Sequence, residues 1–210
     1  MATALIVQGG WDGHEPGPIS QLLAGWLREA GFTVEVADTL DAFADEAKLK
    51  QLDLLVPIWT MGNIKPEQLN PLLNAVRGGV GIAGLHGGMG DAFRNETEYQ
   101  FMVGGQWVAH PGGIVTYTVN IRETSSPIME GVTDFEITSE QYYMHVDPAN
   151  EVLATTCFAF NNAVMPVVWT KHYGQGRVFY CSAGHVAKDL AIPQLRRILT
   201  RGMLWAARAL

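Results

Sequence analysis

Short apolar runs alternate with stretches of helical periodicity through the first half of the chain. From Ile19 to Ala30, apolar residues recur at helical spacing, and Gly31 is a typical C-terminal stop. A second helix is predicted from Pro66 to Arg77. The predicted strands lie at residues 4–8, 33–37, 53–59 and 80–85. This β-α-β alternation predicts a mostly parallel sheet with helices on both faces and right-handed crossovers.

The second half of the chain is richer in extended segments. The pattern predicts a helix at 91–104, an alternating strand at 114–123 and an extended segment at 135–142. His172 to Gly176 has the composition of a hairpin turn, which predicts an antiparallel extension of the sheet. Further strands are predicted at residues 152–158, 166–171 and 177–182. An amphipathic helix from about Ile192 to Ala209 closes the chain.

Composition narrows the class of protein. With 210 residues, 48% hydrophobic and 17% charged, and no linker or repeat, the chain suits one compact α/β domain spanning 1–210. The net charge of −7 argues against nucleic acid as a partner. Residues 4–7 follow the N-terminus without a basic leader, and no later run of 18 apolar residues occurs, so we expect a cytoplasmic protein without membrane association. Cys157 and Cys181 lie in apolar runs without CxxC spacing, which favours buried thiols.

The glycine-rich stretch from Gly78 to Phe93 carries the strongest local signal. It predicts a buried strand that delivers His86 to a sharp turn, with Asp91 as the N-cap of the next helix. Gly87, Gly88 and Gly90 would permit positive φ and close approach of a ligand to the backbone.

Two motifs can be compared with this stretch. Residues 79–84 satisfy G-x-G-x-x-G, but these glycines enter a strand instead of opening a helix, so no nucleotide cofactor is expected. The better match is a nucleophile elbow in which His86 stands where a Ser or Cys would be.

The histidines can be sorted by the predicted topology. Ligands of open α/β sheets bind beyond the carboxyl ends of the parallel strands. His14, His86 and His185 each follow such a strand and are expected to converge, whereas His172 lies at the opposite end. The histidines on loops whose side the topology leaves open are His110 and His145.

Glu140 interrupts the apolar alternation of an aromatic-rich segment, and it is either a carboxylate that orients or deprotonates an imidazole or a charge at a strand edge. The candidate catalytic residues are His86, His185 and Glu140. The candidate substrate-binding residues are Trp11, Asp12, His14, Trp59, Gly87, Gly88, Asp91, His110, Tyr142 and His145. The rings of Trp11, Trp59, Trp107 and Tyr142 are candidates to line a pocket, because flat rings suit the face of a sugar, although most buried aromatic residues belong to the core.

Several motifs together resemble the ThuA family, named for trehalose utilisation, over nearly the whole chain. They are Gly84-Leu-His-Gly-Gly88, residues 104–111, Ser139-Glu-Gln-Tyr142, residues 173–185 and residues 202–206. The resemblance implies a flavodoxin-like sheet related to class I glutamine amidotransferases. Those relatives carry a catalytic Cys at the elbow and a His-Pro-Glu after the last strand. Here His86 and Val186-Ala187 depart from that pattern, so a glutamyl thioester cannot form by that route.

The resemblance implies sugar catabolism, with a small-molecule sugar, a glycoside or a keto-sugar, as the partner. Three hypotheses follow. The first is an enzyme that uses His86 and His185 as acid and base with Glu140 in support. The second is a metal-dependent enzyme in which some of the histidines bind zinc or a similar divalent ion. The third is a non-catalytic sugar-binding or regulatory protein, and a homo-oligomer is left open in all three.

Overall fold

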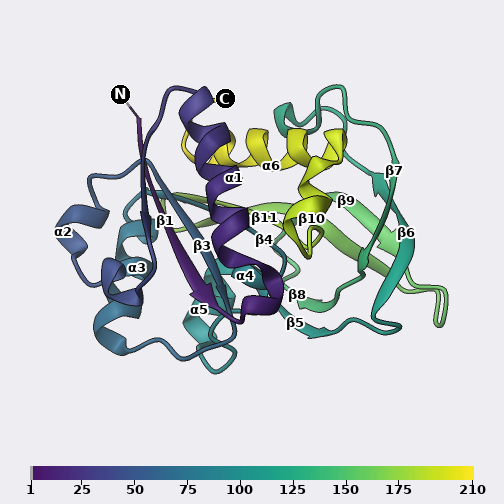
Figure 1. The fold of residues 1–210 in the computed structure, drawn as a ribbon, viewed down its shortest axis with the longest axis horizontal. Coiled ribbons are helices and arrows are strands. Elements are labelled where there is room, and N and C mark those ends of the chain that lie inside the picture. Colours follow the sequence, from purple (N-terminus) through teal and green to yellow (C-terminus); the bar gives the residue numbers. More distant parts are fainter. Residues whose placement is uncertain (1) are drawn as a thin grey trace.

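The computed structural model describes residues 2–210 and is built around a nine-stranded sheet (Figure 1). The strand order is β2-β1-β3-β4-β11-β10-β9-β6-β7, and β5 and β8 form a separate two-stranded sheet. The strands are β1 (Thr3–Gly10), β2 (Thr33–Ala37), β3 (Leu54–Thr60), β4 (Gly81–Leu85), β5 (Gly105–Ala109), β6 (Ile114–Ile121), β7 (Phe135–Glu140), β8 (Tyr143–Val146), β9 (Glu151–Cys157), β10 (Val164–Tyr173) and β11 (Gly176–Cys181).

The first half of the sheet is parallel, as the sequence predicts. Strands β2, β1, β3, β4 and β11 run in one direction, with Leu5 opposite Leu55 and Val178 opposite Ile82. These side chains are fully buried because helices cover both faces of the sheet. All carboxyl ends of these strands therefore meet at one edge.

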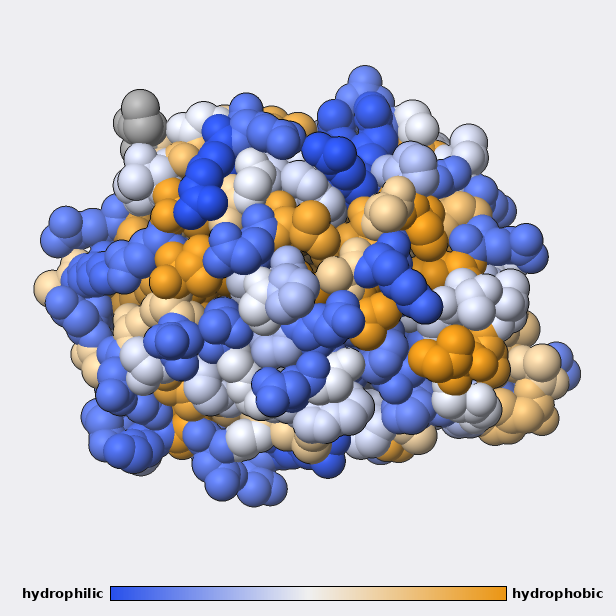
Figure 2. Space-filling model, in the orientation of Figure 1, coloured by the Kyte–Doolittle hydropathy of each residue, from blue (hydrophilic) through white to orange (hydrophobic). Residues whose placement is uncertain are grey.

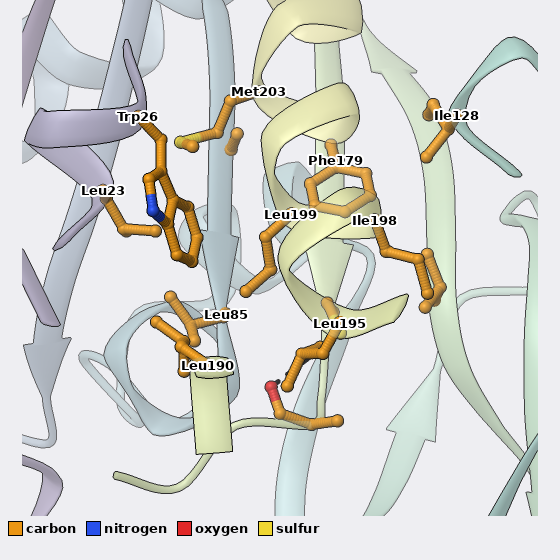
Figure 3. Packing of buried hydrophobic residues seen from close by; sticks show 14 of the residues in the cluster. Leu23, Trp26, Leu85, Ile128, Phe179, Leu190, Leu195, Ile198, Leu199 and Met203 are labelled. Atoms are coloured by element: carbon orange, nitrogen blue, oxygen red, sulfur yellow. Dashed lines mark hydrogen bonds between the residues drawn. The ribbon is translucent and has the colours of Figure 1, made fainter. Parts of the chain in front are cut away.

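The helices form one layer on each face of the sheet. They are α1 (Pro16–Glu29), α2 (Glu46–Leu49), α3 (Pro66–Arg77), α4 (His86–Gly90), α5 (Thr97–Val103) and α6 (Pro193–Ala206), with 3-10 turns η1 (Asp12–His14), η2 (Leu40–Phe43), η3 (Pro127–Met129) and η4 (Ala187–Ala191). Helices α1 and α6 pack on one face, where Leu23, Leu199 and Phe179 meet in the core (Figure 3). Helices α3 and α5 contribute to the core cluster of the other face.

The outer sides of the helices are mostly polar, as amphipathic periodicity requires. Figure 2 shows polar side chains spread over the visible face, with apolar patches between them. Within residues 2–210, no helix is long and apolar enough to cross a membrane.

The antiparallel half of the sheet is larger than the predicted hairpin. Strands β10, β9, β6 and β7 continue the sheet beyond β11. Strand β6 pairs with β9 only at Asn120 and Ile121, whereas it pairs with β7 from Ile114 to Val119. The β6-β7 ribbon therefore diverges from the sheet over most of its length.

Two sequence predictions are wrong. Within the helix predicted at 91–104, only α5 is helical, and Asp91 is the C-cap of the preceding α4 and not an N-cap. The Asp91 carboxylate instead pairs with the guanidinium of Arg94. The two cysteines also differ, since Cys181 is buried and Cys157 is exposed at the end of β9.

Candidate functional site

The site is organised by the turn that follows β4. His86 has a φ of +44°, a left-handed conformation that is costly for a residue with a side chain. The Tyr180 hydroxyl donates a 2.9 Å hydrogen bond to the His86 carbonyl oxygen and helps to hold the turn. This geometry corresponds to the predicted elbow and places the imidazole at the carboxyl edge of the parallel strands.

The glycines after His86 are required for space and not for positive φ, which corrects the expectation from the sequence. None of Gly87, Gly88 and Gly90 lies in the left-handed region. A Cβ atom on Gly87 would overlap the His14 ring, and one on Gly90 would overlap the Tyr180 hydroxyl. Gly87 thus lets α4 pack against His14, and Gly90 lets it pack against Tyr180.

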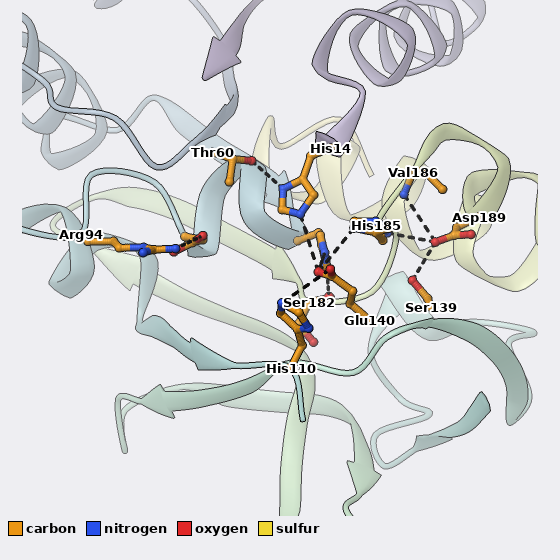
Figure 4. A network of polar contacts seen from close by, with 12 residues as sticks. His14, Thr60, Arg94, His110, Ser139, Glu140, Ser182, His185, Val186 and Asp189 are labelled. Carbon is orange, nitrogen blue, oxygen red and sulfur yellow. Dashed lines mark hydrogen bonds and ion pairs between the residues drawn. The ribbon is translucent and has the colours of Figure 1, made fainter. Parts of the chain in front are cut away.

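Four imidazoles surround the buried carboxylate of Glu140 (Figure 4). His86 Nε2 is 3.1 Å, His185 Nδ1 is 3.4 Å and His14 Nε2 is 3.7 Å from Oε2. His110 Nε2 lies 3.6 Å from Oε1. The predicted convergence of His14, His86 and His185 is thus confirmed, and Glu140 and His110 join them.

Hydrogen bonds orient the two most buried imidazoles. His86 Nδ1 donates to the Ser182 carbonyl oxygen at 2.7 Å, since a carbonyl can only accept. His14 Nδ1 lies 2.8 Å from the Thr60 hydroxyl oxygen. Tyr142 stacks on the His86 ring at a centroid distance of 3.8 Å. The Nε2 atoms of both rings therefore face Glu140.

Burial and the surrounding imidazoles set the charge states of the site. Burial lowers the pKa of His86 to about 4, and the contacts with Glu140 and Ser182 offset only part of this effect. His86 is consequently neutral at pH 7, and its Nε2 atom carries a lone pair. Burial would raise the pKa of Glu140, but the contacts with His14 and His185 outweigh it and keep the pKa well below its usual range.

A cavity of about 160 Å³ opens beside the carboxylate. Its walls are formed by Trp11, His14, Met61, Asp91, Arg94, Trp107, His110, Glu140 and Tyr142. Arg94 forms hydrogen bonds of 2.6 and 2.8 Å with both oxygens of Asp91, and its guanidinium carbon lies 4.6 Å from the Trp107 ring centre. The positive charge at the wall is therefore balanced by Asp91.

Sequence similarity agrees with this architecture. The sequence profile of the ThuA family, described as trehalose utilisation, matches residues 3–206. The chain belongs to the ThuA family. No curated protein shows significant sequence similarity to the chain.

Solved structures share the ThuA fold at low sequence identity. A ThuA-like protein from Parabacteroides merdae is 18% identical, with a TM-score of 0.82 over 98% of this chain and 90% of that chain. A ThuA-like protein from Bacteroides uniformis is 16% identical, with a TM-score of 0.80 over 98% and 91% of the two chains. The cold-adapted β-galactosidase from Rahnella sp. R3 is 15% identical, with a TM-score of 0.69 over all of this chain and 32% of that one.

Several residues of this ThuA-family protein that the sequence predicts to bind substrate lie outside the cavity wall, among them Trp59, Asp12 and His145. Trp59 packs against Gly9 and Gly62, and Asp12 is exposed at the start of η1. His145 is exposed on β8, where the side-chain alternation of a strand directs it away from the buried Met144. His172 is exposed on β10, and its ring centre lies 6.2 Å from that of Trp205. Its separation from the other histidines is as predicted.

Two residues of the cavity wall, Met61 and Arg94, are not predicted from the sequence. For Arg94 a signal exists, because it carries the opposite charge three residues after Asp91. For Met61 the signal is its position directly after β3, at the carboxyl edge of the parallel strands, where it bridges to Ala92.

We expect the metal-free protein to lose stability as the pH falls from about 6.5 to 4.5. In this window unfolded His86 takes up a proton at its ordinary pKa of 6.5, whereas the native ring resists protonation until about pH 4. The loss attributable to His86 is about 2–3 kcal/mol, at 1.36 kcal/mol per pKa unit. Urea denaturation at several pH values should show a shallower pH dependence for His86→Asn than for wild type. Equal slopes would contradict a buried neutral imidazole.

Proposed function

We propose that this ThuA-family protein is an enzyme of carbohydrate utilisation with a divalent metal ion, zinc being the first candidate, in the imidazole cluster. The observation that carries the proposal is the convergence of four ligand atoms within 4.8 Å of one another. The proposed ligands are His14, His86, His185 and Glu140. They come from four separate segments of the chain, and three of the four are buried.

The donor set suits zinc, which binds imidazole nitrogens and carboxylate oxygens. The hydrogen bond from His86 Nδ1 to Ser182 leaves the Nε2 lone pair directed at the Glu140 carboxylate 3.1 Å away. The Nε2 lone pair and the Glu140 carboxylate oxygen repel each other, and a cation bound between them would remove this repulsion. The Ser182 carbonyl and the Thr60 hydroxyl would orient the His86 and His14 rings toward the ion, as hydrogen-bond partners of metal-bound imidazoles do.

The cavity supports a sugar as the substrate. Its volume of about 160 Å³ is below the roughly 300–1,000 Å³ of pockets for drug-sized molecules, which favours one sugar unit. Trp11 and Trp107 provide ring faces. The donor Trp107 Nε1–H and the ring nitrogen His110 Nδ1 are buried without a partner among the described residues. The family description of trehalose utilisation and the β-galactosidase neighbours agree with this class of substrate.

The ion would activate water or polarise a carbonyl oxygen of the substrate. His110 is the most exposed of the four imidazoles around Glu140, with a side chain 37% accessible, and it lies in the cavity wall. We therefore assign it the proton transfer to or from the sugar. His86 and His185, taken from the sequence as an acid–base pair, become ligands in this proposal.

Removing the metal tests the proposal. We expect purified protein to contain about one zinc or similar ion per chain, and a chelator to abolish turnover of keto-sugars or glycosides reversibly. Elemental analysis and turnover before chelation, after chelation and after zinc is restored provide the measurement. Turnover that survives complete chelation would support the metal-free acid–base alternative. Metal-independent binding of sugars without any turnover would support a binding protein.

A further inference from the structure

Glu140 reaches the histidines from a distant part of the sheet. It ends β7, the last strand in the sheet order, whereas His86 follows β4, and four other strands lie between them. Figure 1 shows the β6-β7 ribbon on the side of the molecule opposite α2. Since β6 leaves β9 after two paired residues, the pairing of the sheet alone does not bring Glu140 to His86.

One buried carboxylate connects the two parts of the site (Figure 4). Asp189 Oδ2 accepts a 2.7 Å hydrogen bond from the Ser139 hydroxyl and a 3.0 Å hydrogen bond from the His185 backbone N–H. The Val186 N–H lies 3.5 Å from the same oxygen. Ser139 immediately precedes Glu140, so this oxygen joins the end of β7 to the loop that carries His185.

Other hydrogen bonds of the same strand end remain within the antiparallel half. The Tyr117 hydroxyl donates to the Glu140 carbonyl oxygen at 3.2 Å, and Gln141 Nε2 donates to the Thr156 hydroxyl oxygen at 2.8 Å. Both partners lie on β6 or β9. Glu140 itself contacts the histidines of the parallel half. Among the other described side-chain hydrogen bonds of residues 139–141, the one that crosses to the parallel half joins Ser139 to Asp189.

We infer that Asp189 is a positioning residue of the imidazole cluster. Together with Ser139 and the His185 N–H it forms a clasp that sets the distance between Glu140 and His185, now 3.4 Å. Asp189 is only 5% exposed, and its neighbour Leu190 is buried in the hydrophobic core. This packing holds the Asp189 carboxylate in place. The inference rests on the proposed metal centre, because the clasp acts through two of the ligands.

The test compares zinc dissociation constants, measured by chelator competition, for wild type, Asp189→Ala, Asp189→Asn and Ser139→Ala. We expect Asp189→Ala to weaken zinc binding roughly 10- to 100-fold, the usual range for outer partners of metal ligands. Ser139→Ala should show a smaller loss, and Asp189→Asn, which keeps an acceptor oxygen, should lie between Asp189→Ala and wild type. If the Asn and Ala variants bind equally weakly, the hydrogen-bond acceptor is not responsible and the clasp is overturned.

The matched control is Asp134→Ala. Asp134 accepts a 2.7 Å hydrogen bond from the Ile121 N–H at the other end of the same β6-β7 ribbon, far from Glu140 along β7. We expect this variant to bind zinc as wild type does, even if its melting temperature falls. Equal weakening by Asp134→Ala would show that ribbon stability and not the clasp governs the site.

Histidine ring signals in NMR spectra of the metal-free protein separate this inference from the proposed function. Asp189→Ala should shift the signals of His185 and His86, whereas Asp134→Ala should leave them in place. If wild type binds no zinc, the metal proposal fails. The histidine ring signals of the metal-free variants still show whether Asp189 positions His185 and His86. If Asp189→Ala does not fold, Ser139→Ala decides, and unchanged zinc affinity together with unchanged ring signals in that variant would overturn the inference.

Discussion

Replacing His86 by Asn should lower zinc affinity by at least about 100-fold, more than the loss usual for an outer partner of a ligand. Turnover should fall by roughly 10²-fold or more. Asn retains a donor near the position of Nδ1 and can still reach the Ser182 carbonyl, but it lacks the Nε2 atom that faces Glu140. Zinc competition and turnover per folded molecule provide the measurement.

The stability of the same variant should also change. A side chain at the mouth of a cleft would contribute little to stability, but His86 is only 2% exposed and is stacked on Tyr142. We therefore expect a loss of about 1–3 kcal/mol in addition to the functional effect. His172→Asn is the control, because His172 is exposed on β10 and should affect neither property. A destabilised His86→Asn variant that keeps its zinc affinity and turnover would make His86 a structural residue.

Gly87→Ala should destabilise the protein by about 1–3 kcal/mol and also weaken zinc binding. The added methyl group would overlap the His14 ring and lie close to the Tyr142 hydroxyl, so one or both side chains must move. The effect combines overpacking with displacement of a proposed ligand. Denaturant unfolding and zinc competition on one preparation measure both parts.

Gly25→Ala is the matched control, and we expect it to raise stability where Gly87→Ala lowers it. Gly25 lies within α1, and a Cβ atom there would meet no atom within 4 Å. Alanine is favoured over glycine in a helix, so this variant should gain about 0.5–1 kcal/mol and bind zinc normally. If Gly87→Ala behaves as Gly25→Ala does, the packing reason for the glycines after His86 is wrong.

Thiol chemistry has no support in this site. Burial raises the pKa of the Cys181 thiol to about 12, and its Sγ atom lies 3.8 Å from the Ala183 carbonyl oxygen. Cys157 is exposed at the end of β9 and belongs to a different pocket, which Phe160 also lines. The elbow in this ThuA-family protein presents an imidazole in a position where the resemblance to amidotransferases would place a thiol.

The sequence by itself determined the parallel half of the fold and the convergence of His14, His86 and His185. Apolar runs and helical periodicity are local signals, and a parallel sheet brings the carboxyl ends of its strands to one edge whatever the details of packing. The sharp turn at His86 was also predictable, because glycines follow it directly.

Only the tertiary structure decided how Glu140 and His110 join these histidines. Glu140 arrives through the divergence of the β6-β7 ribbon, and His110 follows β5, whose pairing with β8 joins segments far apart in the sequence. The spatial roles of Gly87 and Gly90 likewise depend on His14 and Tyr180, which approach from other elements. Such contacts are non-local, so hydrophobic periodicity, which reports only the immediate neighbours along the chain, does not encode them.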